Sequence, residues 1–121
     1  MKLFQRTSKS IGDSAEEKAR NYLIKQGIQI LDTNYRCKLG EIDIIAKQDN
    51  TLLFVEVKFR KNSKFGSPSE MVTPQKQKRI VKSTQHYLQA HSNLANKACR
   101  FDVISIQQND IEWIKNAFDA F

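Results

Sequence analysis

The chain has 121 residues, 40% of them hydrophobic, which suits one domain with a single core and excludes a disordered composition. The net charge of +7 favours an anionic partner, of which nucleic acid is the commonest. No apolar run approaches the roughly 20 residues that span a bilayer, and the N-terminus lacks an apolar signal-peptide core. We therefore expect a cytoplasmic protein with no membrane partner.

The first predicted element is a helix. Ser10 or Asp13 can cap it, and Gly27 is suited to end it. The polar and basic residues 1–11 predict a flexible lead-in, so a single domain is expected over residues 12–121. The apolar residues of the helix recur at the spacing of one face: Ala15, Ala19, Tyr22 and Leu23.

Glu16 lies at the edge of the apolar face of this helix. The helix dipole favours an acid in the first turn by only about 0.3–1 kcal/mol. A functional acid would occupy the same position, so the spacing leaves both interpretations open.

Three strands, a second helix and two further strands follow. Thr73 and Pro74 are typical of a helix N-cap and first helical residue, and this helix runs to about Ala90. A polar loop over residues 61–70 precedes it. The strands are expected at residues 28–35, 41–46, 52–59, 100–107 and 111–115.

This order of elements predicts an α/β fold with a mixed sheet. Residues 100–107 are apolar on both faces, as in a strand buried between two layers. The second helix can act as a right-handed crossover that places this strand parallel to a neighbour.

The segment from Gly40 to Arg60, GEIDIIAKQDNTLLFVEVKFR, carries charges where a sheet core is expected. Glu41 and Asp43 share one face of their strand, and Glu56 and Lys58 share a face of the next. A charge in a sheet core is costly unless it is paired or binds a metal. We favour a chemical role for these residues, with a structural salt bridge as the alternative.

Asp43 and Glu56 are the central pair. If they lie opposite each other, their Cβ atoms are about 4.5–5.5 Å apart, and two carboxylates so close repel unless a proton or cation lies between them. Oxygen ligands of this kind suit Mg²⁺ or Mn²⁺. Lys58 points into the same site, where it could orient or deprotonate water or stabilise charge on a phosphate. The combination predicts phosphodiester hydrolysis.

The positive charge is concentrated next to this hairpin. Between Lys58 and Lys82 there are eight Lys and Arg residues against a single acid, Glu70. A scattered excess would indicate a solvated surface, whereas concentration beside the acids favours contact with nucleic acid. The candidate nucleic-acid-binding residues are Arg60, Lys61, Lys64, Lys76, Lys78, Arg79 and Lys82.

Other chemistries fit the sequence less well. Glycosidases also use two carboxylates, but they have no use for so basic a surround. The GxSxG, HExxH, P-loop and GxGxxG motifs are absent. His86 and His91 are spaced wrongly for chelation from one helical face. Cys37 and Cys99 are too few for a zinc site and are predicted to be free thiols.

Several motifs taken together resemble a known family. They are Gly12-x3-Glu16-x2-Ala19, NYR at 34–36, GEIDIIA at 40–46, FVEVKFR at 54–60, KRI at 78–80 and RFDV at 100–103. This combination is similar to the YraN family of bacterial proteins over about residues 12–106. The spaced acids followed by EVK also resemble the PD-(D/E)XK nuclease superfamily, whose closest well-understood members are archaeal Holliday-junction resolvases.

The resemblance implies a restriction-endonuclease-like αβββαβ core and assigns roles within it. Asp43 and Glu56 would bind Mg²⁺ or Mn²⁺, with the Val57 carbonyl as a further ligand. Lys58 would be the catalytic lysine, and Glu16 the helix-borne acid that completes the metal site. Glu41 would lie just outside these ligands.

Three functions remain open on the sequence. The first is a metal-dependent endonuclease acting on DNA, including branched or repair intermediates. The second is a non-catalytic nucleic-acid-binding module with a vestigial site. The third is a protein-interaction partner in a repair complex. A domain of this size is small to hold two duplex arms, so a homodimer is expected.

Overall fold

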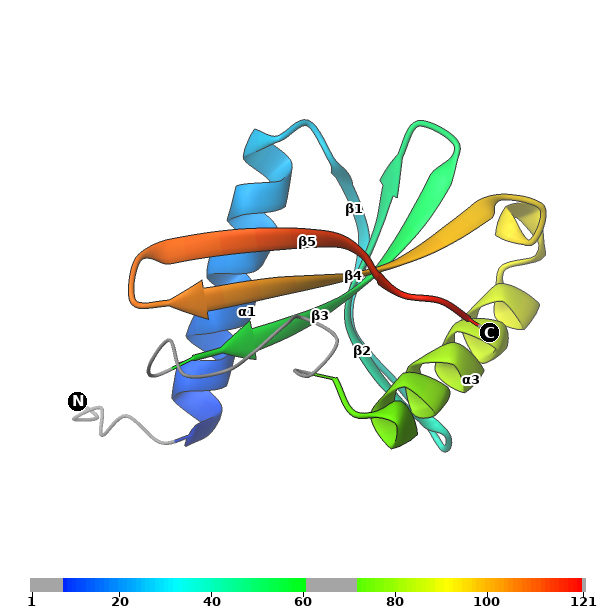
Figure 1. Cartoon of the computed structure of the whole chain (residues 1–121). Coiled ribbons are helices and arrows are strands. Elements are labelled where there is room, and N and C mark those ends of the chain that lie inside the picture. Colours follow the sequence, from blue (N-terminus) through cyan, green and yellow to red (C-terminus); the bar gives the residue numbers. More distant parts are fainter. Residues whose placement is uncertain (1–7, 61–71, 121) are drawn as a thin grey trace, which may run out of the picture.

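The computed structural model, which describes residues 8–60 and 72–120, is a five-stranded sheet with a long helix on each face (Figure 1). The order of elements is the predicted one. They are α1 (Ser8–Lys25), β1 (Gln29–Cys37), β2 (Gly40–Gln48), β3 (Thr51–Phe59), α3 (Pro74–Ala90), a short 3-10 helix η1 (Ser92–Leu94), β4 (Ala98–Gln107) and β5 (Asp110–Phe118).

The sheet is mixed, which confirms the predicted fold class. Its strands lie in the order β1-β2-β3-β4-β5. All neighbours pair antiparallel except β3 and β4, which pair parallel from Thr51–Ala98 to Phe59–Ile106. The segment that contains α3 makes the crossover between these two strands, as parallel pairing requires.

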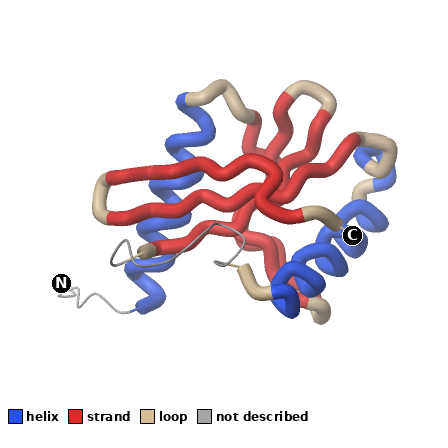
Figure 2. Tube along the Cα trace, in the orientation of Figure 1, coloured by secondary structure: helices blue, strands red, loops and turns tan. Residues whose placement is uncertain are grey.

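The two helices cover opposite faces of the sheet (Figure 2). Ala15, Ala19 and Leu23 of α1 pack in a buried cluster with Ile44 and other residues of one face. A second cluster on the other face holds Ile80, Val81 and Tyr87 of α3. The apolar residues that recur at helical spacing in α1 and α3 therefore form the buried faces that the sequence predicts.

The sheet divides into a fork at one end. Pairing between β2 and β3 runs from the Gln48–Thr51 turn only as far as Ile44 and Val55. Beyond that point β2 stays paired with β1, and β3 stays paired with β4. Figure 1 shows β2 and β3 diverging there, β2 toward the start of α3 and β3 past α1.

An irregularity in β1 and β2 coincides with the fork. The two strands pair at Thr33–Ile44 and Tyr35–Ile42, with no pair recorded for Asn34 and Asp43 between them. Asn34 has a φ of 52°, a left-handed conformation that asparagine tolerates better than most residues. Ile42 and Ile44 consequently pack on opposite faces of the sheet, although regular alternation would put them on the same face.

Element boundaries differ from prediction mainly at the ends of the chain. α1 begins at Ser8 rather than near Asp13, so residues 8–11 of the expected lead-in are helical. Residues 1–7 and the predicted loop at 61–70 lie outside the described residues. The edge strand β5 has nine residues and extends to Phe118, three beyond the predicted end.

The start of α3 follows the sequence prediction closely. Thr73 caps it, its Oγ1 accepting a hydrogen bond from the Lys76 backbone N–H at 3.2 Å, and Pro74 is the first helical residue. Cys37 and Cys99 are free thiols. No helix within residues 8–60 and 72–120 is long and apolar enough to cross a membrane.

Asp102 is a buried charge that joins β4 to β5. It has no solvent exposure, and its carboxylate accepts hydrogen bonds from the Arg100 guanidinium, Trp113 Nε1 and the Asn116 backbone N–H, each at 2.9 Å. Trp113 in turn makes an edge-to-face contact with Tyr22 of α1. This network explains how β5 continues past the irregularity in its pairing with β4.

We predict that Asp102→Ala lowers the free energy of unfolding by at least about 2 kcal/mol, because it leaves the Arg100 guanidinium, Trp113 Nε1 and the Asn116 backbone N–H without their buried acceptor. The measurement is urea unfolding followed by circular dichroism. Asp110→Ala, which removes an exposed acid from the same hairpin, is the control and should change stability little. Equal effects of the two substitutions would contradict the role assigned to Asp102.

Candidate active site at the fork of the sheet

The predicted pair of acids lies at the point where β2 and β3 separate. Asp43 and Glu56 are the next residues after the last β2–β3 pair, Ile44 and Val55. Asp43 extends toward β3, and its Oδ2 accepts a hydrogen bond from the Val57 backbone N–H at 2.8 Å. The carboxylate thus occupies the place that a ladder hydrogen bond would otherwise fill.

The same contact orients the Val57 carbonyl. In a β-strand, the N–H and C=O of one residue point toward the same neighbouring strand. Because the Val57 N–H faces Asp43, its carbonyl oxygen also faces the fork. This is the orientation expected of a further oxygen ligand.

Glu16 approaches Asp43 from the α1 side of the sheet. The two carboxylates line a small cavity of about 190 Å³, together with Thr33 and Asn34 of β1. Glu16 is half-buried in the third turn of α1, next to Ala15 and Ala19, which pack on β2 and β3. The structure therefore brings the helix-borne acid and the β2 acid together.

Glu56 is approached by cations from the other face of the sheet. It is buried, with 6% of its surface exposed. Its Oε1 lies 3.8 Å from Lys58 Nζ on its own strand and 2.5 Å from Lys76 Nζ on α3. The opening in the sheet thus brings together two strand acids and one strand lysine with an acid from α1 and a lysine from α3.

Burial raises the pKa of both strand acids. The pKa of Asp43 rises to about 6 through burial and the neighbouring Glu16 charge, although the Val57 N–H opposes the shift. The pKa of Glu56 rises to about 7 through burial and the charge of Asp43, against the effect of Lys76 and Lys58. Burial and the nearby Lys76 ammonium lower the pKa of Lys58.

These residues fit a hard divalent cation by their chemistry. Mg²⁺ is usually held by one or two carboxylates and keeps several waters, and Mn²⁺ takes similar oxygen ligands. Asp43, Glu56 and the Val57 carbonyl offer such oxygens at a site that lacks enough positive charge to lower the two pKa values. Within residues 8–60 and 72–120, no group of three His, Cys, Asp or Glu side chains is placed to hold a metal, so Glu16 would complete the set only after moving.

A larger pocket opens beside the acids. It has a volume of about 600 Å³ and lies between the β1–β2 turn and the first half of α3. Gly40 permits the close approach of these elements, since its φ is 149° and a Cβ there would come 3.1 Å from Ser83 Oγ. Arg36, Lys76 and Arg79 supply its positive charge.

The predicted nucleic-acid-binding residues that the structure describes divide into three groups. Lys76 and Arg79 line the pocket, while Lys78 and Lys82 are exposed one turn apart on another part of the α3 surface. Arg60 follows β3, its backbone N–H donating to the Ile106 carbonyl at 2.7 Å. Lys61 and Lys64 lie outside the described residues.

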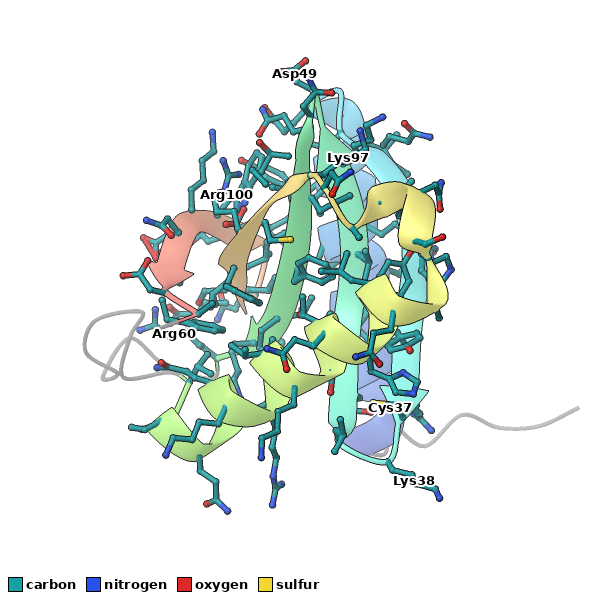
Figure 3. The ribbon with its side chains drawn as sticks, turned by 90° about the vertical axis from the view of Figure 1, so that its right-hand side faces the viewer. Cys37, Lys38, Asp49, Arg60, Lys97 and Arg100 are labelled. Atoms are coloured by element: carbon teal, nitrogen blue, oxygen red, sulfur yellow. The ribbon has the colours of Figure 1, made fainter. Side chains whose placement is uncertain are left out.

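Figure 3 shows how these parts are arranged around α3. Asp49 marks the closed end of the β2–β3 hairpin. Toward the other end, Arg60 and the turn at Cys37 and Lys38 lie apart from each other, as the fork requires.

Two features were missed by sequence reasoning. Lys76 was assigned only to nucleic-acid binding, yet it contacts Glu56. A signal was present, because a lysine in the first turn of a helix is opposed by the dipole. Arg36 was not singled out at all, and Glu41, expected near Asp43, instead pairs with Arg36 at 3.3 Å.

We predict that Asp43→Asn stabilises the metal-free protein at pH 8. The folded protein retains protons on Asp43 and Glu56 that the unfolded chain releases above pH 4, so stability falls as the pH rises toward 7. Asparagine avoids the charge and can still accept the Val57 hydrogen bond. The gain is up to about 3 kcal/mol.

Urea unfolding at pH 8 and pH 3.5 without divalent cations measures this effect. The variant should exceed the wild type at pH 8 and differ little at pH 3.5, and Asp110→Asn is the matched surface control. A variant less stable than wild type at pH 8 would refute the claim that the buried charge is uncompensated.

Known proteins resemble this chain over most of its length. The model of the family described as "Uncharacterised protein family UPF0102" matches residues 15–106. A UPF0102 protein of Saccharophagus degradans is 51% identical over 107 residues, which cover 88% of this chain and 91% of that protein. A UPF0102 protein of Vibrio vulnificus is 45% identical over 120 residues, which cover 97% of each. The chain therefore belongs to UPF0102, the YraN family that its sequence motifs indicate.

Proposed function

We propose that the protein is a Mg²⁺- or Mn²⁺-dependent endonuclease that hydrolyses phosphodiester bonds in DNA. The observation that carries the proposal is the meeting of Asp43, Glu56 and Lys58 in the fork, where Glu56 is buried, Asp43 is half-buried and the pKa values of both acids are raised. Lys76 and Lys58 pair with Glu56 without returning its pKa to the ordinary value, and acids whose pKa values stay raised in this way are typical of functional sites.

Asp43, Glu56 and the Val57 carbonyl would hold the metal. Glu16, which lies next to Asp43, would add a further carboxylate oxygen after moving toward it. A bound metal of this kind polarises a phosphate oxygen and lowers the pKa of a coordinated water. Lys58 would accept a proton from the attacking water or donate one to the charge that develops on the phosphate. Its lowered pKa supports this role.

The pocket beside the acids supports a path for the nucleic acid strand. Its cations lie next to the candidate metal ligands, since Lys76 belongs to both. Phosphates on either side of the scissile bond would contact Arg36 and Arg79 in this pocket and the exposed Lys78 and Lys82 beyond it. Branched DNA or a repair intermediate would engage two copies of the chain, so we expect a homodimer on such a substrate.

A second function is favoured by one specific observation. Lys76 already contacts Glu56, and the described residues hold no group of three metal-binding side chains. A non-catalytic nucleic-acid-binding module with a vestigial site would have the same features. Metal dependence separates the two functions.

We predict that wild-type protein cleaves DNA in the presence of Mn²⁺, and that Asp43→Ala and Lys58→Met each lower the rate at least about 100-fold. Single-stranded, duplex and four-way-junction substrates are compared by gel electrophoresis. Lys25→Met removes an exposed charge at the far end of α1 and should retain activity. Absence of cleavage on every substrate, or equal cleavage by wild type and Asp43→Ala, would exclude the nuclease.

We also predict that Arg36→Ala/Arg79→Ala weakens DNA binding and reduces the slope of log K against log salt by about 1.5–2, because two phosphate contacts are lost. Fluorescence anisotropy at several salt concentrations measures both quantities. The control, Lys25→Ala/Lys97→Ala, removes the same charge away from the pocket. An unchanged slope in the pocket variant, or the same change in both, would place the nucleic acid elsewhere.

A further inference from the structure

Lys76 makes the closest charged contact of the candidate site. Its Nζ lies 2.5 Å from Glu56 Oε1, whereas Lys58 Nζ lies 3.8 Å from the same oxygen. Lys76 lies on α3, twenty positions after Glu56 in the chain, so the contact depends on how the helix packs across the fork. Both ammonium groups therefore lie at one oxygen of the carboxylate that the proposed metal would bind.

A metal and the Lys76 ammonium cannot share this oxygen at low cost. Mg²⁺ lies about 2.1 Å from its ligands. With Lys76 Nζ at 2.5 Å, the two cations would be no more than about 4.6 Å apart in a half-buried site. Lys58 adds a third positive charge to the same region.

The Lys76 ammonium can move from Glu56 into the neighbouring pocket. Its side chain is 40% exposed, compared with 6% for Glu56, so the ammonium can leave without crossing the core. It also lines the large pocket with Arg36 and Arg79. Its backbone lies in the first turn of α3, where the helix dipole attracts anions.

Resting on the proposed function, we infer that Lys76 is a resident counter-cation that occupies Glu56 in the metal-free protein and is displaced into the pocket when the metal binds. Lys76 is thus a competitor of the metal and, once released, a contact for a phosphate of the substrate. The metal-free protein keeps one of its buried acids paired, and metal binding makes a phosphate-binding cation available. Lys76 is a positioning residue whose location reports the state of the site.

The inference predicts that removing Lys76 strengthens metal binding in the absence of DNA. At pH 8.5, Lys76→Met should bind Mn²⁺ about 5-fold or more tightly than wild type. Isothermal titration calorimetry or the loss of the free Mn²⁺ signal in electron paramagnetic resonance gives the dissociation constant. Lys25→Met, which removes an equal but distant charge, should leave the constant unchanged.

The same variant should bind DNA more weakly in the presence of metal, because the released ammonium is missing from the pocket. A second measurement follows the wild-type protein and uses the variant only to assign one resonance. The Lys76 side-chain resonance, assigned by its absence in Lys76→Met, should shift when Mg²⁺ saturates the protein.

The outcomes separate this inference from the proposed function. Mn²⁺ binding that is lost in Asp43→Asn but equal or weaker in Lys76→Met overturns the role of Lys76 and leaves the metal site standing. A Lys76 resonance that does not shift when Mg²⁺ saturates the protein also overturns the role of Lys76 and leaves the metal site standing. Absence of Asp43-dependent Mn²⁺ binding in wild type overturns both.

Discussion

The structure depends on the early end of the pairing between β2 and β3. A regular sheet would have continued the ladder through Asp43 and Glu56 and filled both faces with apolar side chains. Instead the backbone partners of β3 beyond Val55 include the Asp43 carboxylate, and the opening is occupied by charge. Such an opening is costly, because buried charges must be compensated. The fold offsets part of this cost with the Val57 N–H on Asp43 and with Lys76 of α3 on Glu56, whereas Glu16 of α1 adds a further negative charge.

The rest of the domain holds the two branches of the fork in place. β3 pairs with β4 without interruption along its whole length, and β2 pairs with β1 on both sides of Asp43, so each acid is carried on a strand that has a partner on its outer side. Asp102 joins β4 to β5 and orders Trp113, against which Tyr22 of α1 packs. The position of α1, and with it Glu16, is therefore linked to the far edge of the sheet. Partly buried charge is concentrated at Asp43 and Glu56, where binding of a cation would offset it.

The parts of the fold that depend on local chemistry were predictable from the sequence. The start of α3 follows from Thr73 and Pro74, the central strands follow from apolar runs, and the placement of Asp43, Glu56 and Lys58 on neighbouring strands follows from the pattern of charges within those runs. The fork was not predictable, since the point at which two strands stop pairing depends on tertiary packing. The contact of Lys76 with Glu56 requires knowing how α3 crosses the sheet. The length of β5 was underestimated because its continuation depends on the Asp102 carboxylate rather than on a residue pattern within the strand.

The central claim is that the two acids of the fork form a metal site, and a crystal structure with Mn²⁺ tests it most directly. The account predicts anomalous density between the Asp43 and Glu56 carboxylates, about 2.1–2.2 Å from their oxygens and within reach of the Val57 carbonyl. It also predicts that Lys76 Nζ has left Glu56. Crystals saturated with Mn²⁺ that show no density there, with Asp43 still bound to the Val57 N–H and Lys76 still on Glu56, would contradict it.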